Sequence, residues 1–205
     1  MSLLDIEKAV AQILMSLGMV EDSVLKTYIA ELNNDFTDKI SLDGHDPLKG
    51  TFEKINRILY PLGFSVRTLR MPSDNGVTVF HGAANMDDDY VATTYGSPYS
   101  VVELQFFKSV CRALATEKHL STYTIHNLRA HEKGYDWTNR DAERFLFRMH
   151  EDNWLQRDDR NFWMLGPRSH MELRSLIVDA IRADRDTAES VIEERILELP
   201  QMLFY

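Results

Sequence analysis

Three arginines recur at four-residue intervals in the second half of the chain: Arg140, Arg144 and Arg148. On a helix this spacing places them along one stripe, and Arg168 and Arg174 follow soon after. Guanidinium groups in such a row can contact the phosphates of duplex DNA. Acidic residues interleave with them, so the stripe can equally be a solvated face with its own ion pairs. Both interpretations stay open, and these five residues are the candidate DNA contacts.

The last residues of the chain are unusually apolar. Among them, the residues that we expect to contact a partner are Ile192, Ile196, Leu199, Leu203 and Phe204. An exposed apolar segment of this kind usually covers something. Packing on its own domain and docking on a partner protein fit this pattern equally well.

No catalytic or metal-binding motif is present. The chain contains no GxSxG, no Gly-rich phosphate loop and no HExxH. The single cysteine, Cys111, falls on the apolar face of a helical pattern, which indicates a packed thiol. One thiol excludes an internal disulfide and a cysteine-based zinc cluster built by this chain alone. We therefore expect no catalytic residue, no cofactor site and no metal ligand here.

The composition excludes several classes of protein. The 205 residues carry a formal net charge of −9, which argues against wholesale coating of nucleic acid. No apolar run approaches the roughly 18–20 residues that cross a bilayer, and the N-terminus has no signal-peptide pattern. A single cysteine fits a reducing compartment, either cytosol or nucleus.

The first half of the chain predicts helices followed by a hairpin. Apolar residues at three- and four-residue intervals predict helices over 3–17, 24–32 and 52–62, and alternating residues predict strands over 64–70 and 77–82. Pro72 and the Asn75-Gly76 pair favour a turn between the strands. Three helices and a hairpin in this order are typical of a winged helix.

The second half repeats this order of elements. Helical patterns cover 101–114, 123–130 and 141–149, and Thr138 with Asp141 resembles a capping box. The runs 154–156 and 161–165 flank a charged turn and predict a second hairpin, whose Trp154 and Trp163 supply core for a small domain. Ser169 with Glu172 predicts a capping box for a helix through Ile181, and a last helix runs to Pro200.

The predicted fold is therefore mostly α with small β hairpins, built as tandem winged-helix domains. The first domain is expected at 1–95 and the second at 96–185. Residues 186–205 are expected to form a C-terminal helix.

Four stretches resemble the non-SMC element one family, a subunit family of the SMC five/six chromosome-maintenance complex. They are ILMSLGMVEDSVLK (13–26), FEKINRILYPLGFSVRTL (52–69), VELQFFKSVCRAL (102–114) and AERFLFRMHEDNWLQRDDRNFWMLGPRSHMELRSLI (142–177). Their order and spacing carry the resemblance over nearly the whole chain.

The resemblance implies an interaction subunit in the nucleus, associated with chromatin and serving DNA repair by homologous recombination. Its implied partners are a MAGE-type non-SMC element three and a kleisin, non-SMC element four. Contact with the SMC heads would be indirect, and double-stranded DNA would be reached through the complex. No membrane contact is implied.

Members of the resembled family continue into a zinc-binding RING domain and ligate ubiquitin. This sequence ends at LPQMLFY, where that domain would begin. We therefore expect zinc only in the absent RING domain and no ligase activity from this chain alone. One alternative is a free-standing tandem winged-helix regulator that binds double-stranded DNA, and another is a trafficking or proteasome-type scaffold.

Overall fold

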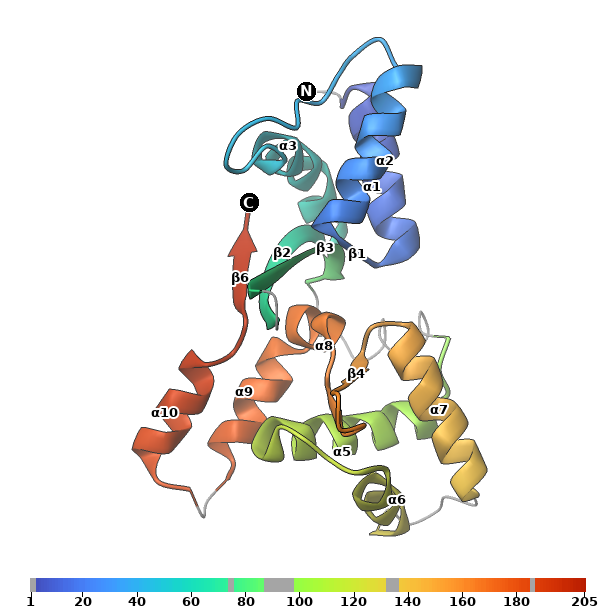
Figure 1. Cartoon of the computed structure of the whole chain (residues 1–205), viewed down its shortest axis with the longest axis vertical. Helices are drawn as coiled ribbons and strands as arrows, with labels where there is room; N and C mark the ends of the chain where they lie inside the picture. Colours follow the sequence, from blue (N-terminus) through green and yellow to red (C-terminus); the bar gives the residue numbers. More distant parts are fainter. Residues whose placement is uncertain (1–2, 74–75, 87–97, 132–136, 185–186) are drawn as a thin grey trace. The chain divides into compact units, whose positions relative to one another are not determined.

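The computed structural model describes residues 3–73, 76–86, 98–131, 137–184 and 187–205. The chain divides into two units (Figure 1). Unit 1 comprises Met1–Asp87 with Pro200–Tyr205, and unit 2 comprises Asp88–Leu199. Each unit combines helices with a β hairpin, which confirms the predicted fold class. Within the described residues, no helix has both the length and the apolar character needed to cross a membrane.

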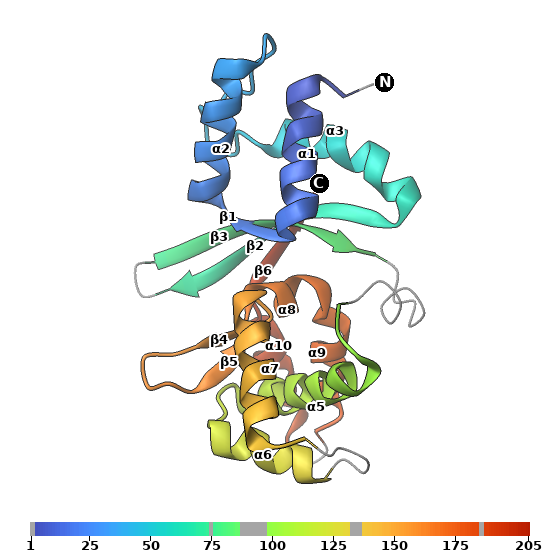
Figure 2. The same cartoon turned by 90° about the vertical axis from the view of Figure 1, so that its right-hand side faces the viewer.

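The helices of unit 1 all lie on one face of its sheet (Figure 2). They are α1 (Asp5–Leu17), α2 (Asp22–Asp35) and α3 (Lys49–Leu59), followed by the short helix η1 (Tyr60–Leu62). The Glu7 carboxylate accepts a hydrogen bond from the backbone N–H of Leu4 and caps α1. Gly18 ends that helix with a φ of 69°, a value that favours glycine.

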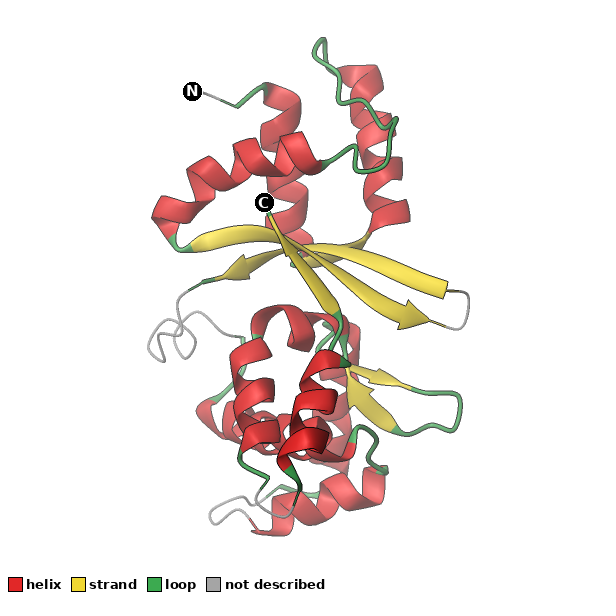
Figure 3. Cartoon of the chain, turned by 90° about the vertical axis from the view of Figure 1, so that its left-hand side faces the viewer, coloured by secondary structure: helices red, strands yellow, loops and turns green. Residues whose placement is uncertain are grey.

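The sheet of unit 1 is antiparallel, with strand order β1-β3-β2-β6 (Figure 3). Its strands are β1 (Met19–Glu21), β2 (Phe64–Ser73), β3 (Gly76–Asn85) and β6 (Gln201–Phe204). β2 and β3 form the predicted hairpin, which is longer than its sequence pattern indicated because the pairing runs from Phe64↔Asn85 to Ser73↔Gly76.

The core of unit 1 lies between the helices and the sheet. Its buried residues are Ile6, Val10, Leu14, Val20, Leu25, Ile29, Ile40, Leu48, Phe52, Ile55 and Val66. A buried amide links the core to the sheet, because Asn56 Nδ2 donates to the carbonyl oxygens of Val66 (3.0 Å) and Tyr205 (3.1 Å). Asn56 Oδ1 accepts from the N–H of Val66 at 2.6 Å. This side chain therefore holds α3, β2 and the C-terminal segment together.

The expectation of a single helix over 186–205 is wrong at its end. Helix α10 spans Glu189–Leu197 and belongs to unit 2, whereas 201–204 form strand β6 of unit 1. Pro200 cannot continue the helix. The residues after it gain hydrogen bonds by pairing with the edge of β2 at Arg67–Arg70.

Unit 2 begins with three helices, α5 (Val101–Glu117), α6 (Thr122–His131) and α7 (Asn139–Glu151). The hairpin of β4 (Leu155–Arg157) and β5 (Trp163–Leu165) follows, then α8 (Pro167–Glu172), α9 (Arg174–Arg182) and α10. The predicted capping box of Thr138 and Asp141 is confirmed, and Ser100 with Glu103 forms a second one at α5.

Trp163 is the largest fully buried side chain of unit 2. Its Nε1–H donates to Thr122 Oγ1 at 3.0 Å, and its backbone pairs with Leu120, which joins the start of α6 to the hairpin. Trp154 is only half-buried and lies edge-on to Phe107, with 5.6 Å between ring centroids. The two tryptophans therefore pack in different ways.

The capping box predicted at Ser169 and Glu172 is wrong. Ser169 is buried, and its hydroxyl donates to the carbonyl oxygen of Trp154 at 2.6 Å. The helical segment begins earlier, at Pro167, and is interrupted at Leu173, which separates α8 from α9. Proline is favoured in the first turn of a helix, which explains the earlier start.

Candidate functional site

The arginine stripe lies on α7, as its spacing predicts. The inward face of this helix is buried through Ala142, Phe145, Leu146 and Met149. Arg140 and Arg144 are exposed. They stand beside the acidic Asp141, whose pKa is lowered first by hydrogen bonds with Thr138 and then by the charges of Arg144 and Arg140.

Arg148, the third member of the stripe, is engaged within unit 2. It forms an ion pair with Glu103, and its guanidinium carbon lies 4.7 Å from the ring centroid of Tyr99. Burial alone would raise the pKa of Glu103, but hydrogen bonds with Ser100 and the charge of Arg148 lower it below its usual range. Arg148 therefore ties the start of α5 to the end of α7.

Arg168 and Arg174 are also held by the fold. Arg168 Nε donates to Glu172 Oε1 at 2.6 Å, and its guanidinium carbon lies 4.4 Å from the ring centroid of Trp154. Burial lowers the pKa of Arg174, which is half-buried. Of the five predicted DNA contacts, Arg140 and Arg144 are therefore the two that remain exposed.

The predicted partner contacts are divided between the two units. Ile192, Ile196 and Leu199 pack against the core of unit 2. Leu203 and Phe204 belong to β6 in unit 1, where Leu203 pairs with Thr68. Phe204 is 64% exposed, and Arg67 lies over its ring. Phe204 therefore offers the largest apolar surface of this set to a partner.

A groove of about 880 Å³ runs along unit 2. It is lined by Lys108, Arg112, Ala113, Thr116, Glu117, Leu176, Asp179, Ala180, Ala183, Asp184 and Arg195. These residues come from α5, from α9 and the two residues after it, and from α10, and both signs of charge occur among them. One pair is internal, because Arg195 Nη1 lies 3.2 Å from Asp184 Oδ2. This mixture of charges indicates no particular ligand.

In the described parts of the chain, no three His, Cys, Asp or Glu side chains gather in a way that could hold a metal ion. Burial raises the pKa of the Cys111 thiol, which is fully buried, so it remains protonated and inert at neutral pH.

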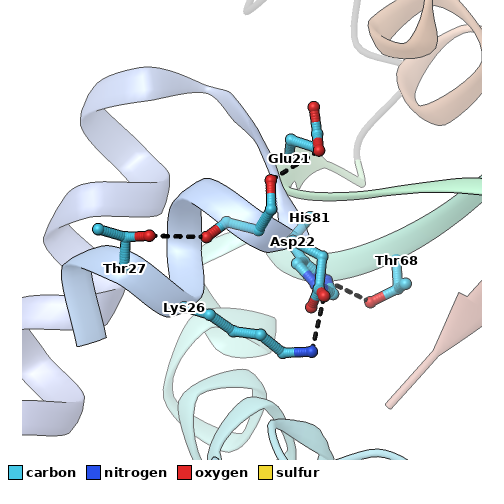
Figure 4. Close-up of polar contacts among 7 residues, drawn as sticks. Glu21, Asp22, Lys26, Thr27, Thr68 and His81 are labelled. Atoms are coloured by element: carbon cyan, nitrogen blue, oxygen red, sulfur yellow. Dashed lines mark hydrogen bonds and ion pairs between the residues drawn. The ribbon is translucent and has the colours of Figure 1, made fainter. Parts of the chain in front are cut away.

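A polar network that sequence analysis missed lies inside unit 1 (Figure 4). His81 Nε2 is 2.9 Å from Asp22 Oδ1, and His81 Nδ1 is 2.8 Å from Thr68 Oγ1. Lys26 also pairs with Asp22 at 2.7 Å. Because a carboxylate only accepts, His81 Nε2 carries the proton and Nδ1 accepts from the Thr68 hydroxyl.

The charge state of this network follows from its burial. Burial lowers the pKa of His81, against the opposing effect of Asp22, so the ring is neutral at pH 7. Burial alone would raise the pKa of Asp22, but hydrogen bonds with Lys26 and His81 outweigh it and the net shift is downward.

The order hydroxyl, imidazole, carboxylate resembles a nucleophilic triad, but this network cannot act as one. Thr68 is 2% exposed and His81 is 4% exposed, so a substrate has no access to the hydroxyl. The network instead joins β2, β3 and the first turn of α2. The signal in the sequence was a histidine at an alternating position of a strand, which indicates an inward-facing side chain.

The buried His170 is expected to make unit 2 less stable in acid. It is 9% exposed, and its Nδ1 has no hydrogen-bond partner among the described residues. Burial, with a smaller effect of Arg174, lowers the pKa of His170 to about 4. Between that value and the unfolded pKa of about 6.5, the unfolded chain binds more protons than the folded chain, so stability falls as pH falls.

We expect the free energy of unfolding of unit 2 to be about 2 kcal/mol lower at pH 5 than at pH 7 from His170 alone. Urea unfolding at several pH values measures how the free energy of unfolding of unit 2 changes with pH. His170→Gln should reduce this change. An NMR titration of the wild-type ring gives an independent check. A midpoint for His170 near 6.5 would contradict the prediction.

Comparison with known proteins adds two findings. The model of the family described as Nse1 non-SMC component of SMC5-6 complex matches residues 7–173. Among solved structures, a chain of an Nse1-Nse3-Nse4 complex is similar at 22% identity, with a TM-score of 0.67 over 84% of this chain and 73% of that chain. At this identity the likeness shows a shared fold. No curated protein sequence matches the chain.

Proposed function

This chain belongs to the Nse1 family of non-SMC components of the SMC5-6 complex, and we propose that it serves there as a docking subunit. Its partners in this proposal are Nse3, the MAGE-type subunit, and Nse4, the kleisin. The family match over residues 7–173 carries the proposal. The similar solved structure is an assembly of the same three components, which supports this choice of partners.

The character of the described residues favours docking over catalysis. Polar groups that could do chemistry, such as Thr68 and His81, are buried and satisfied within the fold. Exposed apolar side chains occur instead on both units, among them Tyr123, Leu197 and Phe204. A stable docking interface would bury roughly 1,200–2,000 Å². We place the complex in the nucleus, on chromatin, in DNA repair by recombination.

Phe204 provides the test of docking. Phe204→Glu is expected to weaken binding to a purified Nse3–Nse4 pair by at least about tenfold, because it places a charge in an apolar contact. Leu62→Glu is the matched control, since Leu62 is 65% exposed and Phe204 64%. Isothermal titration calorimetry measures both. Failure of the wild-type chain to bind would refute docking, and equal effects of the two variants would refute the role of Phe204.

Contact with duplex DNA is a subsidiary proposal, restricted to Arg140 and Arg144. These two side chains are exposed on α7, but Asp141 and Glu143 lie between them in sequence and weaken the local positive field. A salt-dependent shift of duplex DNA by the isolated chain, lost in Arg140→Glu/Arg144→Glu, would favour the alternative of a DNA-binding regulator.

We also propose that this chain works without a cofactor. Elemental analysis of the purified chain tests this, and one zinc ion per chain would contradict it. Ubiquitin ligation is proposed only for a longer protein that includes a zinc-bound RING domain.

A further inference from the structure

One edge of the unit 1 sheet is open. β2 pairs with all ten residues of β3, from Gly76 to Asn85. On the other side of β3, β1 pairs only with Phe80–Gly82. No strand in the described part of the chain pairs with Gly76–Val79 on that side. Figure 3 shows the β2–β3 hairpin extending past the rest of the sheet.

The open edge lacks the features that normally protect one. Natural edge strands carry charges, proline or bulges that oppose pairing with another chain. Gly76–Val79 is uncharged and includes the β-branched Val77, Thr78 and Val79, and Val77 is 62% exposed. Such a segment is a liability unless another strand covers it.

The opposite edge of the same sheet is protected. β6 covers β2 at Arg67–Arg70, and Pro72 follows in the uncovered part of that strand. β6 supplies four residues, and its end is fixed because the Tyr205 carbonyl oxygen accepts from Asn56 Nδ2 and from the Tyr60 hydroxyl at 2.8 Å. This sheet therefore already holds one short strand, whose end is anchored by side chains of the same unit.

The residues around the open edge indicate which kind of segment could bind there. Glu21 pairs with Phe80, and the chain then turns into α2, so the position opposite Val79 lies next to an exposed carboxylate. Val77 and Val79 share the face of His81 by alternation. An extended segment with apolar residues at alternate positions and a lysine or arginine near Glu21 fits this arrangement.

A second copy of the chain fits less well. Pairing of two four-residue edges alone would bury far less than the roughly 1,200 Å² of a specific stable interface. A segment of a different polypeptide can instead be anchored elsewhere on the complex.

We propose that the edge of β3 at Gly76–Val79 binds an extended, basic-ended segment of a partner polypeptide by β-strand addition. Main-chain hydrogen bonds supply the affinity in this mode, and alternate side chains supply the specificity. The open edge is a feature of the unit 1 sheet, and the choice of a partner segment over a second copy rests on the proposed docking function.

The test uses the full chain and a synthetic peptide of alternating valine and threonine with a lysine at each end. NMR titration is expected to show shifts and slowed amide exchange confined to Gly76–Val79 and the end of β1. N-methylation of the peptide amides that face β3 should weaken binding by about tenfold or more, because it removes main-chain donors and keeps the side chains.

Two variants locate the site. Val77→Lys should weaken peptide binding by a similar factor, and Leu62→Lys, at a position of matched exposure, should leave it unchanged. Absence of binding at millimolar peptide, or equal binding of the N-methylated peptide, would overturn the proposal. So would dimerisation of the chain itself that Val77→Lys abolishes, because the occupant would then be a second copy.

Discussion

Trp163→Ala is expected to lower the free energy of unfolding of unit 2 by about 4 kcal/mol, the range found when a large aromatic is deleted from a core. The side chain is fully buried. Its removal would leave a cavity between α6, α7 and the hairpin, and would leave Thr122 Oγ1 without its indole donor. It would also remove the ring on which Arg157 lies, at 4.1 Å from guanidinium carbon to centroid.

Trp154→Ala is the matched control, because it deletes the same atoms from the same hairpin. Trp154 is half-buried, and its Nε1 has no hydrogen-bond partner among the described residues. We expect a loss of about 1–2 kcal/mol there. Urea unfolding gives both values, and hydrogen exchange assigns them to unit 2. Equal losses in the two variants would contradict the difference in packing.

Local patterns predicted most elements of the fold because those elements depend on neighbours in sequence. The helix that begins after Thr138 follows from its capping box, which joins two residues three positions apart. The first hairpin follows from alternating apolar residues and a turn. The separation of α8 from α9 at Leu173 was not predicted. The Ser169 hydroxyl donates to the carbonyl oxygen of Trp154, which lies on a different element, and this contact cannot be read from the local sequence.

Contacts between distant residues explain what the sequence could not predict. β6 forms because Gln201–Phe204 meets the edge of β2, and Asn56 reaches Tyr205 across a separation of 149 residues. The arginine stripe was predicted correctly as a helical stripe. Its third member is nevertheless paired with Glu103, which lies 45 residues away.

The His81 network shows the same limit for polar groups. His81 and Asp22 are separated by 59 residues, and neither belongs to a motif. Alternation along the strand predicts that His81 points inward, but its partner follows only from the packing of α2 on the sheet. Most buried polar groups have a hydrogen-bond partner, so the inward position of His81 was the usable signal.

Gly166→Ala is expected to lower the free energy of unfolding of unit 2 by about 3 kcal/mol or more, because overpacking against backbone cannot relax by a change of rotamer. Gly166 has an ordinary φ of −81°, so its backbone conformation does not require glycine. A Cβ there would lie 2.3 Å from the carbonyl oxygen of Asn153 and 2.9 Å from the carbonyl carbon of Trp154.

The two backbone segments at Gly166 are also joined by hydrogen bonds, so neither can move away freely. The N–H of Gly166 donates to the Trp154 oxygen at 2.8 Å, and the N–H of Arg168 donates to the Asn153 oxygen at 3.1 Å. Asn153 itself has a φ of 62°, a conformation that the turn must hold.

Gly50→Ala is the control for Gly166→Ala, and the two should change stability in opposite directions. Gly50 lies in α3, and a Cβ there meets nothing within 4 Å. Alanine in a helix is favoured over glycine by up to about 1 kcal/mol, so this variant should be slightly more stable than wild type. Urea unfolding measures both changes. A Gly166→Ala protein as stable as wild type would contradict the close approach of the two segments. A loss of stability confined to unit 2 would show that this approach requires glycine at position 166.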